Sequence, residues 1–183
     1  MKGIDLWRGA VLAATVLGTS ALLAGGHDGD GDRRLPPVTN AAWQAECSSC
    51  HEPYHPGLLP ARSWRTLMGD LGHHFGDNAA LDPVTRDDIA RFLVANAADV
   101  NGNRRSAKIA ASIPASTAPL RITETGYVRA KHDEIRADVW RRPAVGSRAN
   151  CAACHRTAGE GDFSERNVAI PKAGPTAVAA GRR

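Results

Sequence analysis

The spacing of apolar residues along this chain predicts a mostly α-helical protein. Within residues 63–72, large apolar side chains recur at intervals of three and four, which places them on one face of a helix. They are Trp64, Leu67, Met68 and Leu71. Gly72 is expected to end or distort this helix. No alternation of strands and helices of the βαβ kind is visible.

Capping residues and apolar stripes predict three more helices. Asn40 is suited to cap a short helix. Asp82 is followed by proline, which is typical of a helix start, and this helix should span residues 83–96. A further stripe predicts one helix over residues 123–141, which Pro143 stops.

All four cysteines lie in two copies of the pattern Cys-x-x-Cys-His, at residues 47–51 and 151–155. This pattern is typical of covalent haem c attachment. Two thiols on one helical turn can each add to one haem vinyl group, and the next histidine then lies under the iron. The sequence therefore predicts two haem c groups, with His51 and His155 as proximal iron ligands. The attachment sites are Cys47, Cys50, Cys151 and Cys154.

Cysteine pairs also occur in redox disulfides, zinc sites and structural disulfides. A thioredoxin-type redox pair lies in a βαβ pattern, which is absent here. Zinc ribbons separate their two pairs by about 15–20 residues, and far more residues separate Cys50 from Cys151. Structural disulfides would not need a histidine after each pair, so haem attachment is favoured.

His132 is predicted to be the distal ligand of the second haem. It shares a helical stripe with Val128, Ile135 and Val139, so it points into the apolar face. A lone histidine in such a stripe is more often a core residue. This half of the chain offers no other candidate ligand, which reverses that preference.

Three residues compete for the distal position of the first haem. A helical wheel continued beyond residue 72 puts His74 at the edge of the apolar face and His73 opposite it, which favours His74. Met68 lies within the stripe, where core packing explains it better, and it stays an alternative together with His73. His55 follows the proximal histidine closely and is interpreted as a solvent-facing loop residue.

Two histidines on each iron would leave no open position for a substrate and would give comparatively low reduction potentials. Electron transfer is therefore favoured, and the chain is predicted not to be an enzyme. Two alternatives remain, a dihaem peroxidase-like enzyme and a gas-binding sensor. Either would need one open haem position.

Residues 1–26 have the features of a secretory signal peptide. Lys2 and Arg8 precede an apolar run from Gly9 to Ala24, which is shorter than the about 20 residues of a membrane-spanning helix. Export to the periplasm agrees with haem c, which is attached outside the bacterial cytoplasm. The net charge is +4, but no run of Lys and Arg interleaved with aromatics is present, so nucleic-acid binding is not predicted.

The apolar periodicity typical of helices is absent from residues 99–119, which are rich in Asn, Gly, Ser, Ala and Pro and are predicted to form a linker.

The predicted fold class is mostly α, with a class I-like cytochrome c N-terminal domain and a small C-terminal domain organised by its haem. The predicted parts are a signal peptide (1–26), a flexible lead (27–37), haem domain 1 (38–98), the linker (99–119), haem domain 2 (120–171) and a disordered tail (172–183).

With these motifs in place, the chain resembles the dihaem cytochrome c family of proteobacterial periplasms. Beyond the two pentapeptides, the resemblance rests on distinctive short blocks. They are residues 54–64 (YHPGLLPARSW), His74-Phe-Gly, Ala80-Leu-Asp82, Arg121-Ile-Thr-x-Thr-x-Tyr127, His132-x-Glu-Ile135 and Phe163. Together they cover nearly all of the chain between about Trp43 and Pro171.

The resemblance implies a class I-like N-terminal domain and a smaller C-terminal domain, each with one haem between two histidines. The ligand positions of the family match His51, His74, His132 and His155. The resemblance also implies that the protein donates electrons to a small oxygen-binding monohaem cytochrome c. A membrane cytochrome b is the other partner that it implies.

Overall fold

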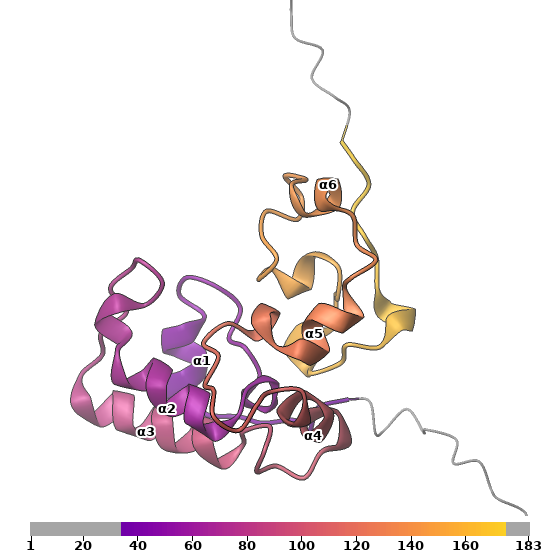
Figure 1. Ribbon diagram of the computed structural model, residues 1–183. Helices are drawn as coiled ribbons and strands as arrows, with labels where there is room; N and C mark the ends of the chain where they lie inside the picture. Colours follow the sequence, from indigo (N-terminus) through magenta and orange to yellow (C-terminus); the bar gives the residue numbers. More distant parts are fainter. Residues whose placement is uncertain (1–33, 175–183) are drawn as a thin grey trace, which may run out of the picture.

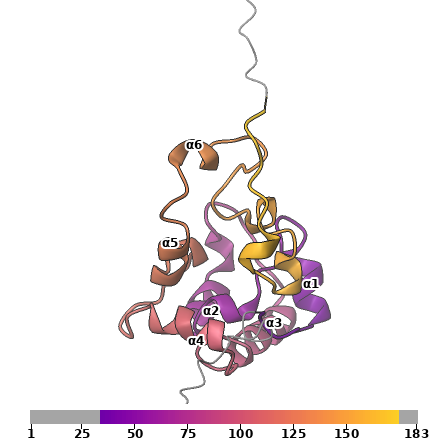
Figure 2. The same ribbon diagram turned by 90° about the vertical axis from the view of Figure 1, so that its right-hand side faces the viewer.

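The structure, a computed structural model, describes residues 34–174. These residues form short helices joined by loops, with no strand among them, which confirms the mostly α fold. Helices α1 to α4 form one body, and α5, α6 and the second motif lie on one side of it (Figures 1 and 2). The predicted signal peptide and most of the predicted tail fall outside the described residues. None of the helices described is both long and apolar enough to cross a membrane.

Most of the helices are only one to three turns long. The α-helices are α1 (Ala41–Cys47), α2 (Ala61–Gly69), α3 (Pro83–Ala95), α4 (Arg104–Ala111), α5 (Gly126–Lys131) and α6 (Ala137–Trp140). The 3₁₀ turns are η2 (Pro56–Leu58), η3 (Leu71–His73), η4 (Ile122–Glu124), η5 (Cys151–Ala153), η6 (Ala158–Glu160) and η7 (Glu165–Asn167).

The principal hydrophobic core lies among α1, α2 and α3. Its buried members are Trp43, Leu59, Ala61, Trp64, Met68, Ile89, Leu93 and Ala97. The Trp64 indole N–H donates to the Pro56 oxygen at 2.7 Å, so the polar edge of this buried ring has a partner. The core thus holds the segment after the first motif against α2.

The helix caps predicted from the sequence are confirmed. The side chain of Asn40 accepts a hydrogen bond from the Trp43 amide at 2.7 Å, and that of Asp82 accepts from two amides of the first turn of α3. The side-chain Nδ2 of Asn40 also donates to the carboxylate of Asp88 in α3 at 2.9 Å. The cap of α1 therefore fixes this helix to α3 as well.

Two of the predicted helices differ from those in the structure. The helix expected over residues 63–72 begins at Ala61 and ends at Gly69, because Asp70 leaves the helical conformation with φ −138° and ψ 46°. The single helix expected over residues 123–141 is two helices, since α5 ends at Lys131 and α6 begins six residues later, at Ala137.

The predicted irregular linker contains α4, so that prediction is wrong for residues 104–111. The side chain of Asn103 caps this helix, and Ile109 is buried in a second apolar cluster with Leu35, Leu58 and Ile113. A Cβ atom on Gly57 would lie 2.6 Å from Ser106 Oγ, which shows how closely η2 approaches α4. Because α4 contacts both η2 and α5, this segment joins the two parts of the molecule.

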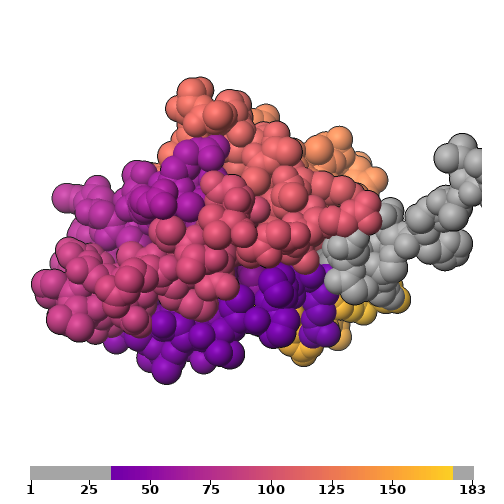
Figure 3. Space-filling model, turned by 90° about the horizontal axis from the view of Figure 1, so that it is seen from below, coloured from indigo at the N-terminus to yellow at the C-terminus, as the bar shows by residue number. Residues whose placement is uncertain are grey.

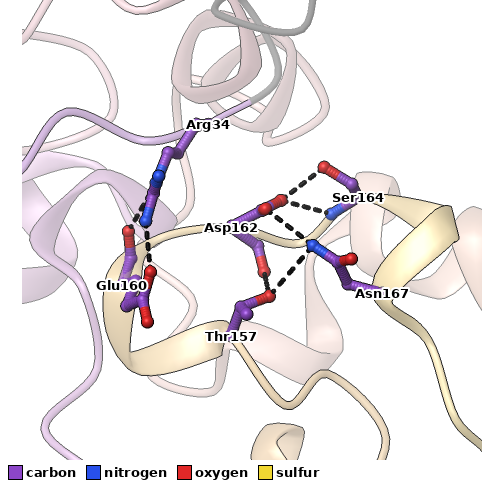
Figure 4. Close-up of polar contacts among 6 residues, drawn as sticks. All are labelled: Arg34, Thr157, Glu160, Asp162, Ser164 and Asn167. Carbon is purple, nitrogen blue, oxygen red and sulfur yellow. Dashed lines mark hydrogen bonds and ion pairs between the residues drawn. The ribbon is translucent and has the colours of Figure 1, made fainter.

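Residues 34–37 of the predicted flexible lead are ordered, and its other residues lie outside the described part of the chain. Leu35 is 1% exposed, and its amide donates to the Gly161 oxygen at 2.9 Å. The guanidinium of Arg34 forms an ion pair with Glu160 (Figure 4). The first described residues therefore lie beside the segment that follows the second motif (Figure 3).

Few large side chains are buried in residues 120–171. The buried residues there are Thr125, Val139, Val145, Ala158, Gly161 and Ser164. Polar contacts organise the loop after the second motif instead. The Asp162 carboxylate accepts from the Ser164 amide at 2.9 Å and from Asn167 at 2.8 Å, and Thr157 donates to the Asp162 backbone oxygen at 3.0 Å (Figure 4). This half of the molecule has little apolar core of its own.

Candidate functional site

The first motif begins at the end of α1, where Cys47 is the last helical residue and Cys50 and His51 follow in a turn. Nδ1 of His51 lies 2.7 Å from the Glu52 backbone oxygen. A carbonyl oxygen can only accept, so Nδ1 carries the proton and Nε2 keeps its lone pair. Tyr54 stacks on this imidazole, with the ring centres 4.9 Å apart.

His74 faces His51 across the first site. Their ring centres are 6.1 Å apart, and their planes differ by 19°. His74 follows η3 and precedes a tight turn with positive φ at Phe75 (56°) and Gly76 (108°), a conformation that is unusual for a bulky residue. Burial and the neighbouring His51 lower the pKa of His74. Its imidazole is therefore neutral, as a metal ligand must be.

The two alternatives predicted for this position lie elsewhere. His73 is exposed, and its ion pair with Asp70 raises its pKa. Met68 is buried among the core residues of α2 and α3. The structure thus brings His74, rather than His73 or Met68, to the imidazole of the first motif.

His55 is buried, so its interpretation as a solvent-facing residue is wrong. Nε2 donates to the Pro36 oxygen at 2.8 Å, and Nδ1 accepts from the Gly57 amide at 2.9 Å. Both ring nitrogens are used within the protein, so His55 has none left for a metal.

The second motif begins in η5, and the His155 amide donates to the Cys151 oxygen at 2.8 Å. His132 faces His155 with ring centres 5.9 Å apart and planes at 73°. Nδ1 of His132 donates to the Val128 oxygen at 2.7 Å, which again leaves Nε2 with its lone pair. Burial, together with nearby His132, lowers the pKa of His155.

Both pairs of imidazoles have the separation that one shared metal ion requires. Two rings bound through nitrogen at about 2.1 Å each would have centres about 6 Å apart. The distances of 6.1 Å and 5.9 Å agree with this value. Nδ1 of His74 and of His155 is buried without a hydrogen-bond partner in the part of the chain described. Each motif could therefore hold an iron between two imidazoles, beside two thiols.

The thiols do not resemble those of a redox disulfide. All four are free, and burial raises the pKa of Cys47 and that of Cys151 to about 11. A reactive redox cysteine has a lowered pKa instead. Within residues 34–174, no three side chains of His, Cys, Asp or Glu converge as a closed zinc site would require. The geometry therefore favours haem attachment over both alternatives.

The two sites are linked by a residue to which the sequence analysis gave no role. The hydroxyl of Tyr54 donates to the Ala149 backbone oxygen at 2.8 Å, two residues before Cys151. Tyr54 therefore contacts the proximal histidine of the first motif and the chain entering the second. Its place three residues after His51 was visible in the sequence, but no pattern there shows which distant backbone it meets.

Four more residues around the sites were not predicted from the sequence as part of them. Phe163 lies edge-on to His155, with ring centres 5.6 Å apart. Trp140 lies beside His132, while Arg121 and Arg148 cover aromatic rings at the two distal positions. These contacts join segments that are distant in the chain, which apolar periodicity does not reveal.

The family described as dihaem cytochrome c matches residues 43–163 of this chain. The crystal structure of DHC purified from Rhodobacter sphaeroides is 42% identical with a TM-score of 0.58, covering 70% of this chain and 100% of its own. A second structure, diheme cytochrome c from Rhodobacter sphaeroides, is 43% identical with a TM-score of 0.62, covering 69% and 98%. The diheme cytochrome type c from Shewanella baltica OS155 is 39% identical with a TM-score of 0.61, covering 74% and 95%. A comparison with curated proteins found no match.

The matched residues include both Cys-x-x-Cys-His motifs and the four facing histidines. The solved relatives are covered almost from end to end, so the similarity extends far beyond the two pentapeptides. This chain therefore belongs to the dihaem cytochrome c family, whose members carry two haem groups and are electron-carrying cytochromes.

Proposed function

We propose that this protein is a periplasmic electron carrier in which His51 and His74 bind one haem iron and His155 and His132 bind the other. The observation that supports this proposal is the pair of facing imidazoles at each motif, 6.1 Å and 5.9 Å apart. When bound, haem c supplies a reversible one-electron change at its iron.

The side chains at each site have separate tasks. Cys47, Cys50, Cys151 and Cys154 attach the two haems covalently. The carbonyls of Glu52 and Val128 hold the Nδ1 protons of His51 and His132, which fixes each ring with Nε2 as the ligand atom. Two imidazoles on each iron leave no position for a substrate and favour a low reduction potential, so the protein carries electrons rather than catalysing a reaction.

The proposed partners are redox proteins. The family resemblance suggests a small monohaem cytochrome c as the electron acceptor and a membrane cytochrome b as a further partner. Because the two motifs are joined through Tyr54, an electron that enters at one haem can leave from the other. The signal-like residues 1–26 support export, which the mass of the mature protein tests: cleavage after Gly26 leaves His27 as the first residue.

Spectra of the holoprotein test the ligation directly. Protein matured in a host that attaches haem c is expected to show two low-spin haems when oxidised. It should show no methionine-to-iron charge-transfer band in the near infrared, and carbon monoxide added to the reduced form should bind only slowly. A high-spin component, or ready binding of carbon monoxide, would contradict the proposal and favour a peroxidase-like enzyme or a gas sensor.

Single substitutions assign the ligands. His74→Ala should convert the first haem to a high-spin form, and His132→Ala should do the same for the second. His73→Ala and Met68→Leu are the matched controls and should leave both haems low-spin. A high-spin haem in either control would mean that the substituted residue is the distal ligand.

A further inference from the structure

At both distal histidines, an aromatic ring contacts the histidine and an arginine covers that ring. At the first site, the Phe75 ring lies edge-on to His74 with ring centres 4.9 Å apart. The guanidinium carbon of Arg121 lies 4.0 Å from the centre of the same Phe75 ring. An arginine therefore covers an aromatic ring that in turn contacts the distal histidine.

The second site repeats this order with different residues. The Trp140 ring centre lies 6.0 Å from that of His132, and the guanidinium carbon of Arg148 lies 4.8 Å from the Trp140 ring centre. The Trp140 indole N–H donates to the Ile135 oxygen at 3.2 Å, which fixes the ring beside the histidine. The two sites have no common sequence around these residues, so the repetition is one of contacts alone.

Both distal histidines lie at the ends of short helical turns, where the Val128 carbonyl also holds the His132 ring. His74 lies between a single 3₁₀ turn and the positive-φ turn at Phe75, and Phe75 remains 45% exposed. His132 is the C-cap of α5 and directly follows its last residue. Both histidines thus belong to short connections, whose conformation depends on a few side-chain contacts. Arginine is suited to this role because its planar guanidinium stacks on aromatic faces and keeps its charge.

We infer that Arg121 and Arg148 are positioning residues that keep His74 and His132 on the two irons by clamping Phe75 and Trp140. This inference rests on the proposed function, because it takes these histidines as the distal ligands. A distal histidine that leaves its iron for a small fraction of the time opens the sixth position. The observed rate of binding an external ligand is then proportional to that open fraction. The arginines lower the open fraction.

Carbon monoxide binding to the reduced holoprotein measures the open fraction. Arg121→Leu and Arg148→Leu are each expected to raise the observed association rate about fivefold, which corresponds to about 1 kcal/mol of lost cation–π contact. Arg121→Lys should restore most of the native rate, since the ammonium keeps the cation over the ring. Phe75→Leu, which removes the ring and keeps Arg121, should match Arg121→Leu. His74→Ala gives the rate of a fully open first site.

Each haem serves as the internal control for the other. The imidazole planes differ by 19° at the first site and by 73° at the second, so the two low-spin ferric haems should have distinct electron paramagnetic resonance signals. In the Arg121→Leu variant, carbon monoxide should bind to the first haem. After the second haem is reoxidised, only the signal of the first haem should then be missing. Arg86→Leu removes an arginine that is paired with Asp87 on α3, and it should leave the rate of carbon monoxide binding unchanged at both haems.

Unchanged carbon monoxide rates in Arg121→Leu, Phe75→Leu and Arg148→Leu would overturn the inference and leave the proposed ligation intact. An equal rise in the Arg86→Leu control would also overturn it, because the effect would then be a general loss of stability. Rapid binding by the unaltered protein would instead contradict the proposed function itself.

Discussion

For a histidine, the hydrogen bond on one ring nitrogen decides what the other nitrogen can do. In His51 and His132, a backbone carbonyl takes the Nδ1 proton, so Nε2 keeps a lone pair for a metal. In His55, Nε2 donates and Nδ1 accepts, so both nitrogens are committed to the fold. Residue type and position alone do not separate these roles, whereas the hydrogen bonds do.

The role of His55 predicts a specific pH dependence of stability. Burial lowers the pKa of His55 below its ordinary value of 6.5, and a protonated Nδ1 could no longer accept from the Gly57 amide. The unfolded chain therefore binds this proton more readily than the folded protein. The stabilising contribution of neutral His55 is complete above about pH 6.5, and it is lost as the pH falls through the lowered pKa.

His55→Gln should remove this part of the pH dependence. Denaturant unfolding of the holoprotein between pH 5 and 8 is the measurement, and the free energy of unfolding of the variant should fall less steeply below about pH 6.5. Comparison at pH 8 gives the cost of the lost hydrogen bonds separately, about 1–3 kcal/mol. Equal slopes for the two proteins would mean that His55 does not titrate differently on folding.

The structure places His74, and not His73, opposite His51, but the helical argument that favoured His74 does not hold. The helical wheel assumed that α2 continues through Gly72, but α2 ends at Gly69. A 3₁₀ turn and the turn at Phe75 bring His74 to His51. Apolar periodicity marks the face of a helix, but it does not show where a helix ends when a glycine and an aspartate follow it.

Among the secondary-structure elements, α4 differs most from the sequence prediction. Its sequence, residues 104–111, contains isoleucine as the only large apolar residue, so no stripe is visible. Nevertheless Ile109 is 1% exposed, and it lies between the two halves of the molecule. Helices marked by N-caps and regular stripes, such as α3, could be predicted. A helix that buries a single large side chain could not.

Ile109→Ala is expected to lower the free energy of unfolding by about 2–5 kcal/mol, because it leaves a cavity among Leu35, Leu58 and Ile113. Lys108→Ala is the matched control on the exposed face of the same helix, and it should change stability by less than about 0.5 kcal/mol. Chemical denaturation monitored by circular dichroism distinguishes the two. An effect of Ile109→Ala no larger than that of the control would mean that α4 is not required to hold the halves together.

At the scale of the whole molecule, the two halves differ in how much of their core the chain supplies. The first half encloses two tryptophans and several aliphatic side chains, whereas residues 120–171 bury only small or medium-sized ones. Backbone ordering costs about 1–2 kcal/mol per residue, so a half with so little apolar burial needs another source of stability. The proposed haem would supply that apolar surface.

Loss of haem attachment should therefore affect the two halves unequally. In Cys151→Ser/Cys154→Ser, amides in residues 120–171 should exchange with deuterium rapidly, while those of α1 to α3 stay protected. The matched variant Cys47→Ser/Cys50→Ser should leave more protection in residues 38–98, where the apolar core remains. Slow exchange throughout residues 120–171 in the first variant would show that this half folds without its haem.

Tyr54 is placed to set the spacing of the two haem motifs, since its ring stacks on His51 and its hydroxyl holds Ala149 at 2.8 Å. Tyr54→Phe keeps the stacked ring and loses only that hydrogen bond. The free energy of unfolding of this variant should be about 1 kcal/mol lower. Electron equilibration between the haems should also slow, because tunnelling falls steeply with distance and the chain before Cys151 is no longer fixed.

Tyr127→Phe separates this effect from the loss of a hydroxyl in general. Tyr127 packs against the second apolar cluster, and it is the other tyrosine of the chain. Pulse reduction followed by absorbance at the two haems measures the equilibration rate in both variants. A slower rate in Tyr54→Phe alone would identify the Tyr54–Ala149 contact as the link that fixes the distance between the haems. Equal rates in both variants and the unaltered protein would show that the haems keep their separation through other contacts, such as the burial of Ile109 between the halves.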